Sequence, residues 1–164
     1  MRTETVKKRL AVSGFQLDDD AIVEIGPWMR WSTSFCALFT IVGTWLASPW
    51  VIWALGMTAL AGSVLPHHPF DYAYNHGLRR LTKTQPLPPN PPARKFACRI
   101  ATPWLFVTGL AFFLGATTAG YVLGGLFASV ALLVSVTHIC IPSILYNALF
   151  GANLGQTGTA QRAQ

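Results

Sequence analysis

The chain has 164 residues, of which 52% are hydrophobic and only 11% are charged, which excludes an ordinary soluble domain of this length. Its formal net charge is +6, but the basic residues stand in short segments beside apolar blocks, so anionic lipid headgroups are favoured over nucleic acid as their partner. Charged residues are absent from residues 31–70 and 100–161, where we expect the membrane-embedded helices.

Residues 1–30 are predicted to form a cytoplasmic amphipathic segment on the membrane surface. The stretch "TETVKKRLAV" places Val6 and Leu10 on one side of a helix, with Glu4 and Lys8 at the favourable i, i+4 spacing. The acidic run in "LDDDAIVEIGPW" is interpreted as a helix cap rather than a cation site. The basic start lacks the apolar core and cleavage site of a secretory signal, so no processing is expected.

Residues 31–65 are predicted to form a first transmembrane hairpin. A bilayer core about 30 Å thick requires about 20 apolar residues per helix, and Ser48-Pro49 divides this block into spans at Trp31–Ala47 and Trp50–Leu65. Each span is slightly short, so the hairpin either thins the bilayer or begins further back.

Residues 66–99 are predicted to form a cytoplasmic loop rich in histidine and proline. Pro69 suits the first turn of a helix and Asp71 suits its N-terminal dipole, so "FDYAYNHGLRRL" predicts a short interfacial helix. The proline run at 86–92 predicts extended backbone. It is interpreted as a semi-rigid spacer, with a docking site for a proline-binding domain as the alternative.

Residues 100–150 are predicted to form a second transmembrane hairpin, followed by a cytoplasmic polar tail at 151–164. Its spans are expected at Ala101–Thr117 and Tyr121–Ile141, with Pro103 near the entry of one and Pro142 closing the other. The fold class is therefore all-α integral membrane, with four transmembrane helices as two hairpins. Tyr74-Asn75 and Gly43 match Tyr146-Asn147 and Gly115 at one common offset, which indicates either an internal two-fold repeat or chance similarity.

Four spans place every lysine and arginine on one side of the membrane. The positive-inside rule makes that side the cytoplasm, so we expect a multi-pass protein of the bacterial cytoplasmic (inner) membrane with cytoplasmic N- and C-termini. The residues expected at lipid headgroups are Arg79, Arg80, Lys83, Arg94, Lys95 and Arg99.

A group of polar side chains near the expected cytoplasmic helix ends is a candidate metal or cofactor site. Imidazole, carboxylate and thiolate are common metal ligands, and haem requires only one or two histidines. The spacing matches no established metal motif, so the alternative is that the histidines simply lie in the headgroup zone. No cofactor is identified. The candidate residues are His67, His68, Asp71, His76, His138 and Cys140.

Small residues in "GYVLGGLFAS" recur at helical spacing and predict a packing face. Small side chains let a neighbouring helix approach closely, either within the bundle or from another polypeptide. The residues are Gly120, Gly124, Gly125, Ala128 and Ser129.

The segments "PPNPPARKFACRIATPWLFVTGLAFFLG" and "GGLFASVALLVSVTHICIPSILYNALFG" together resemble the bacterial membrane family DUF4395, a domain of unknown function, over Pro66 to Gly151. The resemblance implies the same membrane topology and supplies no activity. Members of the family often end the last span with a Cys-x-Gly-Cys-like pair, whereas here only Cys140 stands in "HICIPS". This departure counts against a two-thiol chemistry taken from the family.

Two functions remain as hypotheses. Small size and the lack of a catalytic constellation favour a non-catalytic accessory or structural subunit, packed against a larger inner-membrane complex, with membrane lipids and other membrane subunits as partners. The alternative is a small membrane redox, thiol or metal-handling protein that uses the cytoplasmic-side histidines and cysteines. An enzyme is not expected.

Overall fold

The computed structural model describes residues 2–15, 18–137 and 140–160 of the chain, and these ranges contain helices and no strand. The elements are α1 Arg2–Val12, α2 Asp19–Ile25, η1 Trp28–Arg30, α3 Trp31–Trp45, α4 Pro49–Val64, α5 Pro69–Ala73, η2 Tyr74–Leu78, α6 Arg79–Thr82, α7 Pro92–Phe113, α8 Thr117–Thr137 and α9 Ile141–Ala160. The all-α prediction is confirmed for this part of the chain.

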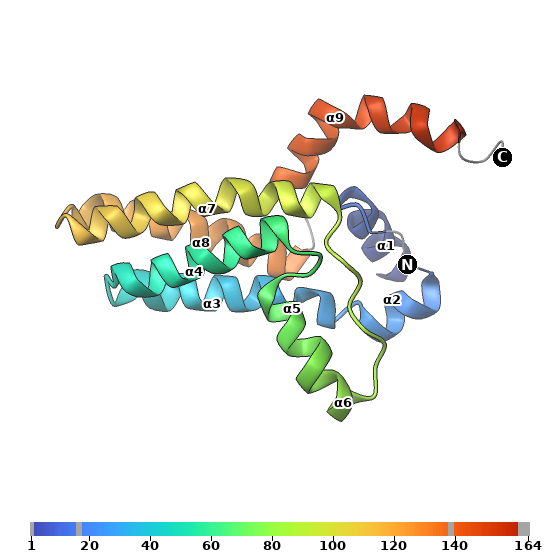
Figure 1. Ribbon diagram of the computed structural model, residues 1–164, viewed down its shortest axis with the longest axis horizontal. Helices are drawn as coiled ribbons and strands as arrows, with labels where there is room; N and C mark the ends of the chain where they lie inside the picture. Colours follow the sequence, from blue (N-terminus) through green and yellow to red (C-terminus); the bar gives the residue numbers. More distant parts are fainter. Residues whose placement is uncertain (1, 16–17, 138–139, 161–164) are drawn as a thin grey trace.

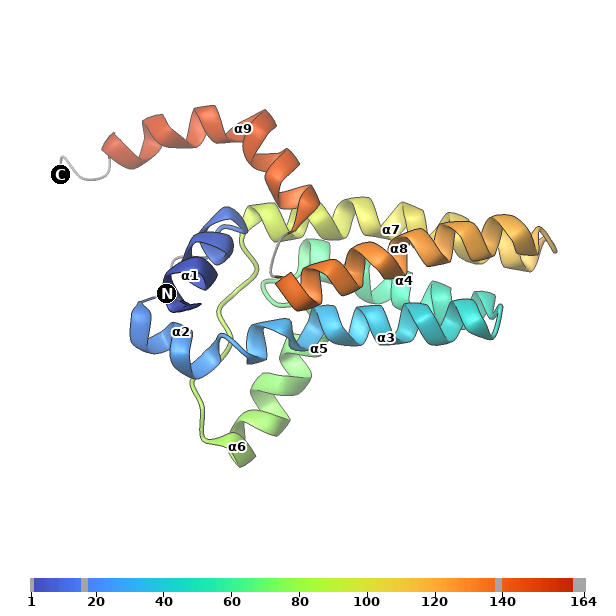
Figure 2. The same cartoon turned by 180° about the vertical axis from the view of Figure 1, so that it is seen from behind.

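Helices α3, α4, α7 and α8 form an elongated bundle (Figures 1 and 2). Helix α4 packs along α7 and α3 packs along α8. The turns that join α3 to α4 and α7 to α8 lie at one end, called here the turn end. Helices α1 and α2 and the arm formed by α5, η2 and α6 lie at the other, the loop end, from which α9 also departs (Figure 1).

Two of the described helices are long and apolar enough to cross a membrane. They are α7, with 22 residues and a mean hydropathy of 1.5, and α8, with 21 residues and a mean hydropathy of 2.0. Helix α4 meets the same test only together with the arm, from which it is separated by a bend of 82°. The membrane-protein prediction is thus supported by two helices, or up to three, while four spans remain a prediction.

Helix α7 begins earlier than predicted, inside the segment expected to be loop. Pro91 is extended, with φ −69° and ψ 161°, and Pro92 occupies the first helical position. Proline is tolerated there because the first N–H of a helix has no partner within the helix. The prolines therefore end the extended segment and begin the helix. Helix α9 likewise continues to Ala160, beyond the predicted start of the polar tail at residue 151.

Two apolar cores hold the bundle and its loop end. The first joins α4 to α7 through Ile52, Leu55, Ala59, Leu105 and Phe112. The second lies at the loop end, where α1 and α2 pack with η1, the arm and the proline-rich residues 84–91. Its buried members are Leu10, Phe15, Ile22, Ile25, Met29, Tyr74 and Leu87. The N-terminal segment is thus packed against the rest of the protein through its apolar face.

Residues 84–91, called here the proline segment, form neither helix nor strand, and Pro91 at their end is extended, as a proline run predicts. The Asn75 side chain holds this segment against the arm. Its Oδ1 accepts a hydrogen bond from the Leu87 N–H at 2.8 Å, and its Nδ2 donates to the Leu87 carbonyl at 3.4 Å. The proline segment is therefore fixed in place at its centre.

Candidate functional site

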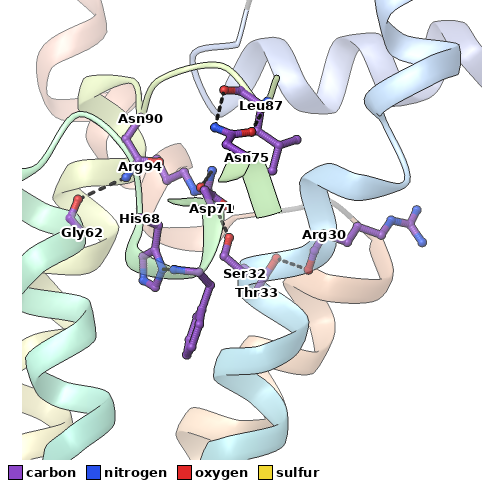
Figure 3. Close-up of polar contacts among 11 residues, drawn as sticks. Arg30, Ser32, Thr33, Gly62, His68, Asp71, Asn75, Leu87, Asn90 and Arg94 are labelled. Atoms are coloured by element: carbon purple, nitrogen blue, oxygen red, sulfur yellow. Dashed lines mark hydrogen bonds and ion pairs between the residues drawn. The ribbon is translucent and has the colours of Figure 1, made fainter. Parts of the chain in front are cut away.

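A buried ion pair lies at the loop end of the bundle, between α5 and α7. Asp71, in the first turn of α5, is 1% exposed, and its Oδ2 lies 3.2 Å from Nη1 of Arg94 on α7. Nη2 of Arg94 donates a hydrogen bond to Oγ of Ser32 on α3 (Figure 3). Neither carboxylate oxygen accepts a hydrogen bond from the described residues, so the positive charge of Arg94 compensates the buried negative charge of Asp71. Through these contacts Arg94 joins α7 to α5 and α3.

His68 caps the N-terminus of α5 and packs against α4. Its Nδ1 accepts a hydrogen bond from the Phe70 N–H at 3.4 Å, and the residue is 4% exposed. The ring lies so close to Gly62 that a Cβ there would come within 2.5 Å of the His68 Cδ2. Burial, with a smaller effect of the Arg94 charge, lowers the pKa of His68 to about 4. The imidazole is therefore neutral at physiological pH.

Asn90 ties the end of α4 to the residues that precede α7. Its N–H donates to the Pro66 carbonyl at 2.6 Å. Its Nδ2 donates to the Gly62 carbonyl at 3.2 Å (Figure 3). Its Oδ1 is buried and has no hydrogen-bond partner among the described residues. The Gly62 carbonyl, in the last turn of α4, is thus satisfied by a residue of the loop.

A largely apolar cavity of about 410 Å³ lies beside the ion pair and extends along α7 and α8. His68 and Arg94 reach it from the loop end. Its wall also contains all three cysteines of the chain, Cys36 from α3, Cys98 from α7 and Cys140 from the residue before α9. All three thiols are free. The Ser143 Oγ is buried, lines the same cavity and has no hydrogen-bond partner among the described residues.

The structure brings together only some of the predicted metal or cofactor residues. His68 and Cys140 line the cavity. Asp71 does not line it but is paired with Arg94, which does. His67 packs its ring against Tyr72 and His76 contacts the Tyr72 carbonyl, so neither lines the cavity. His138 lies outside the described residues. Within residues 2–15, 18–137 and 140–160, no three histidine, cysteine or acidic side chains are placed to hold a metal.

The predicted packing face of α8 divides into an inner and an outer part. Gly120 lies against Phe112, Gly124 faces the Thr44 side chain, and Ala128 is buried. A Cβ on Gly125, by contrast, would meet nothing within 4 Å. Ser129 is also exposed and donates its hydroxyl to the Gly125 carbonyl at 2.8 Å.

The predicted headgroup residues also occupy different surroundings. Arg79, Arg80 and Lys83 are exposed on or beside the arm. Lys95 and Arg99 line a second, smaller cavity between α7 and α9. Arg94 differs from the expectation, because its side chain is only 16% exposed and its guanidinium faces Asp71.

Sequence reasoning missed Ser32 and Asn90 and did not place Cys36 or Cys98 at a site. One signal was present for the ion pair. Asp71 is the only acidic residue after Glu24, and it stands next to an apolar block, where a charge requires a partner. The sequence offers several basic residues as that partner and does not select Arg94 among them.

A family model described as Domain of unknown function (DUF4395) matches residues 27–150. The match covers most of the chain and includes the ion pair and all three cysteines. It confirms the family resemblance seen in the sequence. No curated protein matches the chain, and no solved structure does.

Proposed function

The chain belongs to the DUF4395 family, whose description names no activity, and from its geometry we propose that it is a small integral membrane protein that handles thiols by reversible thiol–disulfide exchange. One observation carries the proposal. The three cysteines come from distant parts of the sequence, yet all of them line one cavity.

The arrangement of the thiols fits exchange within the chain. The Cys98 thiol lies within electrostatic range of both Cys36 and Cys140. Two of these thiols reduce a disulfide of a partner by forming one disulfide in this chain and releasing two thiols, so two electrons and two protons pass to the partner. Reversal of the same step reduces the chain again. Cys98 is the thiol common to both of these coupled pairs, so we expect it to be the common partner in exchange.

Disulfide mapping tests this proposal on the full-length protein in detergent. After treatment with oxidised glutathione, mass spectrometry should find Cys98 joined to Cys36 or Cys140 within one chain. Cys98→Ala should abolish every intramolecular disulfide, whereas Cys36→Ser and Cys140→Ser should each leave one pair intact. If all three thiols stay reduced in the folded protein and react only after unfolding, thiol exchange is wrong.

We further propose that α3 and α4 cross the membrane as shorter helices, giving four spans in two hairpins that arose by duplication. The loop end then faces the cytoplasm of a bacterial cell, with both termini on that side. Support comes from the charges, because the basic residues of η1, α6 and the first turns of α7 lie at the loop end (Figure 1). Impermeant thiol labelling of single cysteines tests it. A cysteine at position 83 should be protected in intact cells and one at position 115 should react.

An accessory role in a larger membrane complex is the second candidate, and one feature of α8 favours it. Gly125 and the exposed Ser129 leave an open strip of small residues, which suits close approach of another transmembrane helix. Gly125→Leu should then release the partner during purification in mild detergent, while Ala119→Leu, at an exposed position about a third of a turn around α8 from Gly125, should not. Recovery of the wild-type chain as a monodisperse monomer would contradict this role.

A further inference from the structure

The smaller cavity lies between α7 and α9 near the loop end and has a volume of about 190 Å³. Lys95 and Arg99 stand one helical turn apart on α7 and both line it. Phe96 of α7 and Tyr146 of α9 complete its aromatic side, with their ring centroids 5.5 Å apart. Asn90 and Pro92 close it towards the proline segment.

The two cations of this cavity lack acidic partners in the described part of the chain. The ion pairs found there are Lys7–Asp19 and Arg94–Asp71. Lys95 makes only one long contact, 3.4 Å from its Nζ to the Val64 carbonyl, and Arg99 makes no polar side-chain contact with the described residues. None of the described residues that line the cavity carries a carboxylate. Two adjacent uncompensated positive charges favour an anion with several oxygen acceptors.

Asn90 adds a second and independent feature. Its Oδ1 is buried, in a residue 6% exposed, and it accepts no hydrogen bond from the described residues. The Asn90 side chain is fixed by its bond to the Gly62 carbonyl, so Oδ1 cannot turn to another protein donor. Most buried acceptors are paired with a donor, and a molecule bound in the cavity that Asn90 lines can supply one here. The cavity therefore suits an anion that also carries a hydroxyl or amine.

The position of the cavity suits a lipid. Lys95 and Arg99 are the last charged residues before the charge-free part of α7 that begins at Ile100. They therefore stand where the apolar span meets its polar end, at the level of phosphate groups in a bilayer. We propose that this cavity binds a phosphate group, held by Lys95 and Arg99, and that the phosphate belongs to a phospholipid whose headgroup donates to Asn90. Phosphatidylglycerol has this chemistry.

Lipid retention tests the proposal on the full-length protein. The protein is reconstituted with phosphatidylcholine and phosphatidylglycerol, exchanged into detergent and analysed by native mass spectrometry. Wild type should retain phosphatidylglycerol. Lys95→Gln/Arg99→Gln should bind it about thirtyfold more weakly, since each basic residue near an anionic surface contributes a factor of about five. The matched control is Arg80→Gln/Lys83→Gln, which removes the same charges from exposed positions on the arm and at its end and should retain the lipid.

Two further measurements complete the experiment. Lys95→Arg/Arg99→Lys keeps both charges and should retain the lipid, which separates lost binding from lost folding. Inorganic phosphate, added to delipidated protein and followed by ³¹P NMR, distinguishes the two sources of the anion. Binding of phosphate that depends on Lys95 and Arg99, without retention of phosphatidylglycerol, would assign the cavity to a free phosphate. If the Gln variant retains phosphatidylglycerol as wild type does and phosphate binding is also unaffected, the site is wrong.

Discussion

Asp71 and Arg94 meet through an oxygen–nitrogen distance of 3.2 Å, each in the first turn of its own helix. Asp71 is almost fully enclosed, whereas Arg94 also contacts Ser32 and the face of the Phe15 ring, 5.7 Å from its centroid. The pair therefore links the arm to α7, α3 and the N-terminal segment. Its removal should disturb the loop end more than the bundle.

Arg94→Met should lower the free energy of unfolding by about 3–5 kcal/mol, because it leaves the Asp71 carboxylate buried without its cation. Asp71→Asn/Arg94→Met should cost less than the two single variants added together, since no unpaired charge remains. Unfolding in mixed micelles of increasing SDS content measures all three. A change of less than about 0.5 kcal/mol for Arg94→Met would contradict a structural role for the pair.

The pH dependence of stability should reveal His68. Its pKa of about 4 in the folded protein lies below the ordinary value of 6.5, so the unfolded chain binds a proton first as the pH falls. The free energy of unfolding should decrease between pH 6.5 and 4, by up to about 1.4 kcal/mol per pH unit from this residue. The full contribution is present above pH 6.5.

His68→Asn keeps a capping acceptor and removes the titration, so its unfolding free energy should depend less on pH in this interval. The charges of Arg94 and Asp71 also act on the pKa of His68, and both residues remain in this variant. His76→Asn is the control, because His76 is exposed. Identical pH profiles for wild type and His68→Asn would contradict the neutral buried imidazole.

Two neighbouring glycines of α8 should respond differently to the same substitution. Gly124→Val places its side chain against both branches of the Thr44 side chain, which rotation of Thr44 cannot relieve. It should cost about 1–3 kcal/mol of unfolding free energy through overpacking of α3 against α8. The side chain of Gly125→Val would extend into open space, so this variant should leave the free energy of unfolding nearly unchanged. Equal effects in SDS unfolding would show that α3 and α8 do not pack at this position.

Asn75 should control the protection of the proline segment. Asn75→Leu removes the acceptor of the Leu87 N–H, so the Leu87 amide should exchange with deuterium at least about tenfold faster, as expected for loss of roughly 1.4 kcal/mol. Hydrogen exchange with mass spectrometry measures this. His76→Ala is the control, since it changes the next residue on an exposed site. An unchanged exchange rate at the Leu87 amide would contradict the proposal that Asn75 holds the proline segment in place.

The sequence predicted the helical character of the chain because charges and prolines delimit the apolar blocks. It also placed Asp71 in the first turn of a short helix, where the structure has it. It did not predict that Arg94 would face inward, because the partner of a buried charge is selected by tertiary packing, and the sequence contains other basic residues nearby. The sequence does not distinguish the helix start at Pro92 from loop, because a proline run suits extended backbone as well as the first turn of a helix.

The cavity could not be predicted for the same reason. Cys36, Cys98 and Cys140 have no common spacing, and only the packing of α3 and α7 beside the start of α9 brings them to one wall. His68 was singled out by its type, but its burial follows from Gly62, whose missing side chain admits the ring. A site assembled from several helices leaves no local pattern in the chain.

The ion pair also constrains how the protein is made. Asp71 follows the hairpin of α3 and α4, whereas Arg94 lies in the first turn of α7. The ribosome therefore synthesises the buried carboxylate before the arginine that pairs with it. The first half of the protein cannot complete its loop end until the second half has been synthesised. Residues 1–83 expressed alone should therefore be degraded in the cell, and co-expression of residues 84–164 should rescue them.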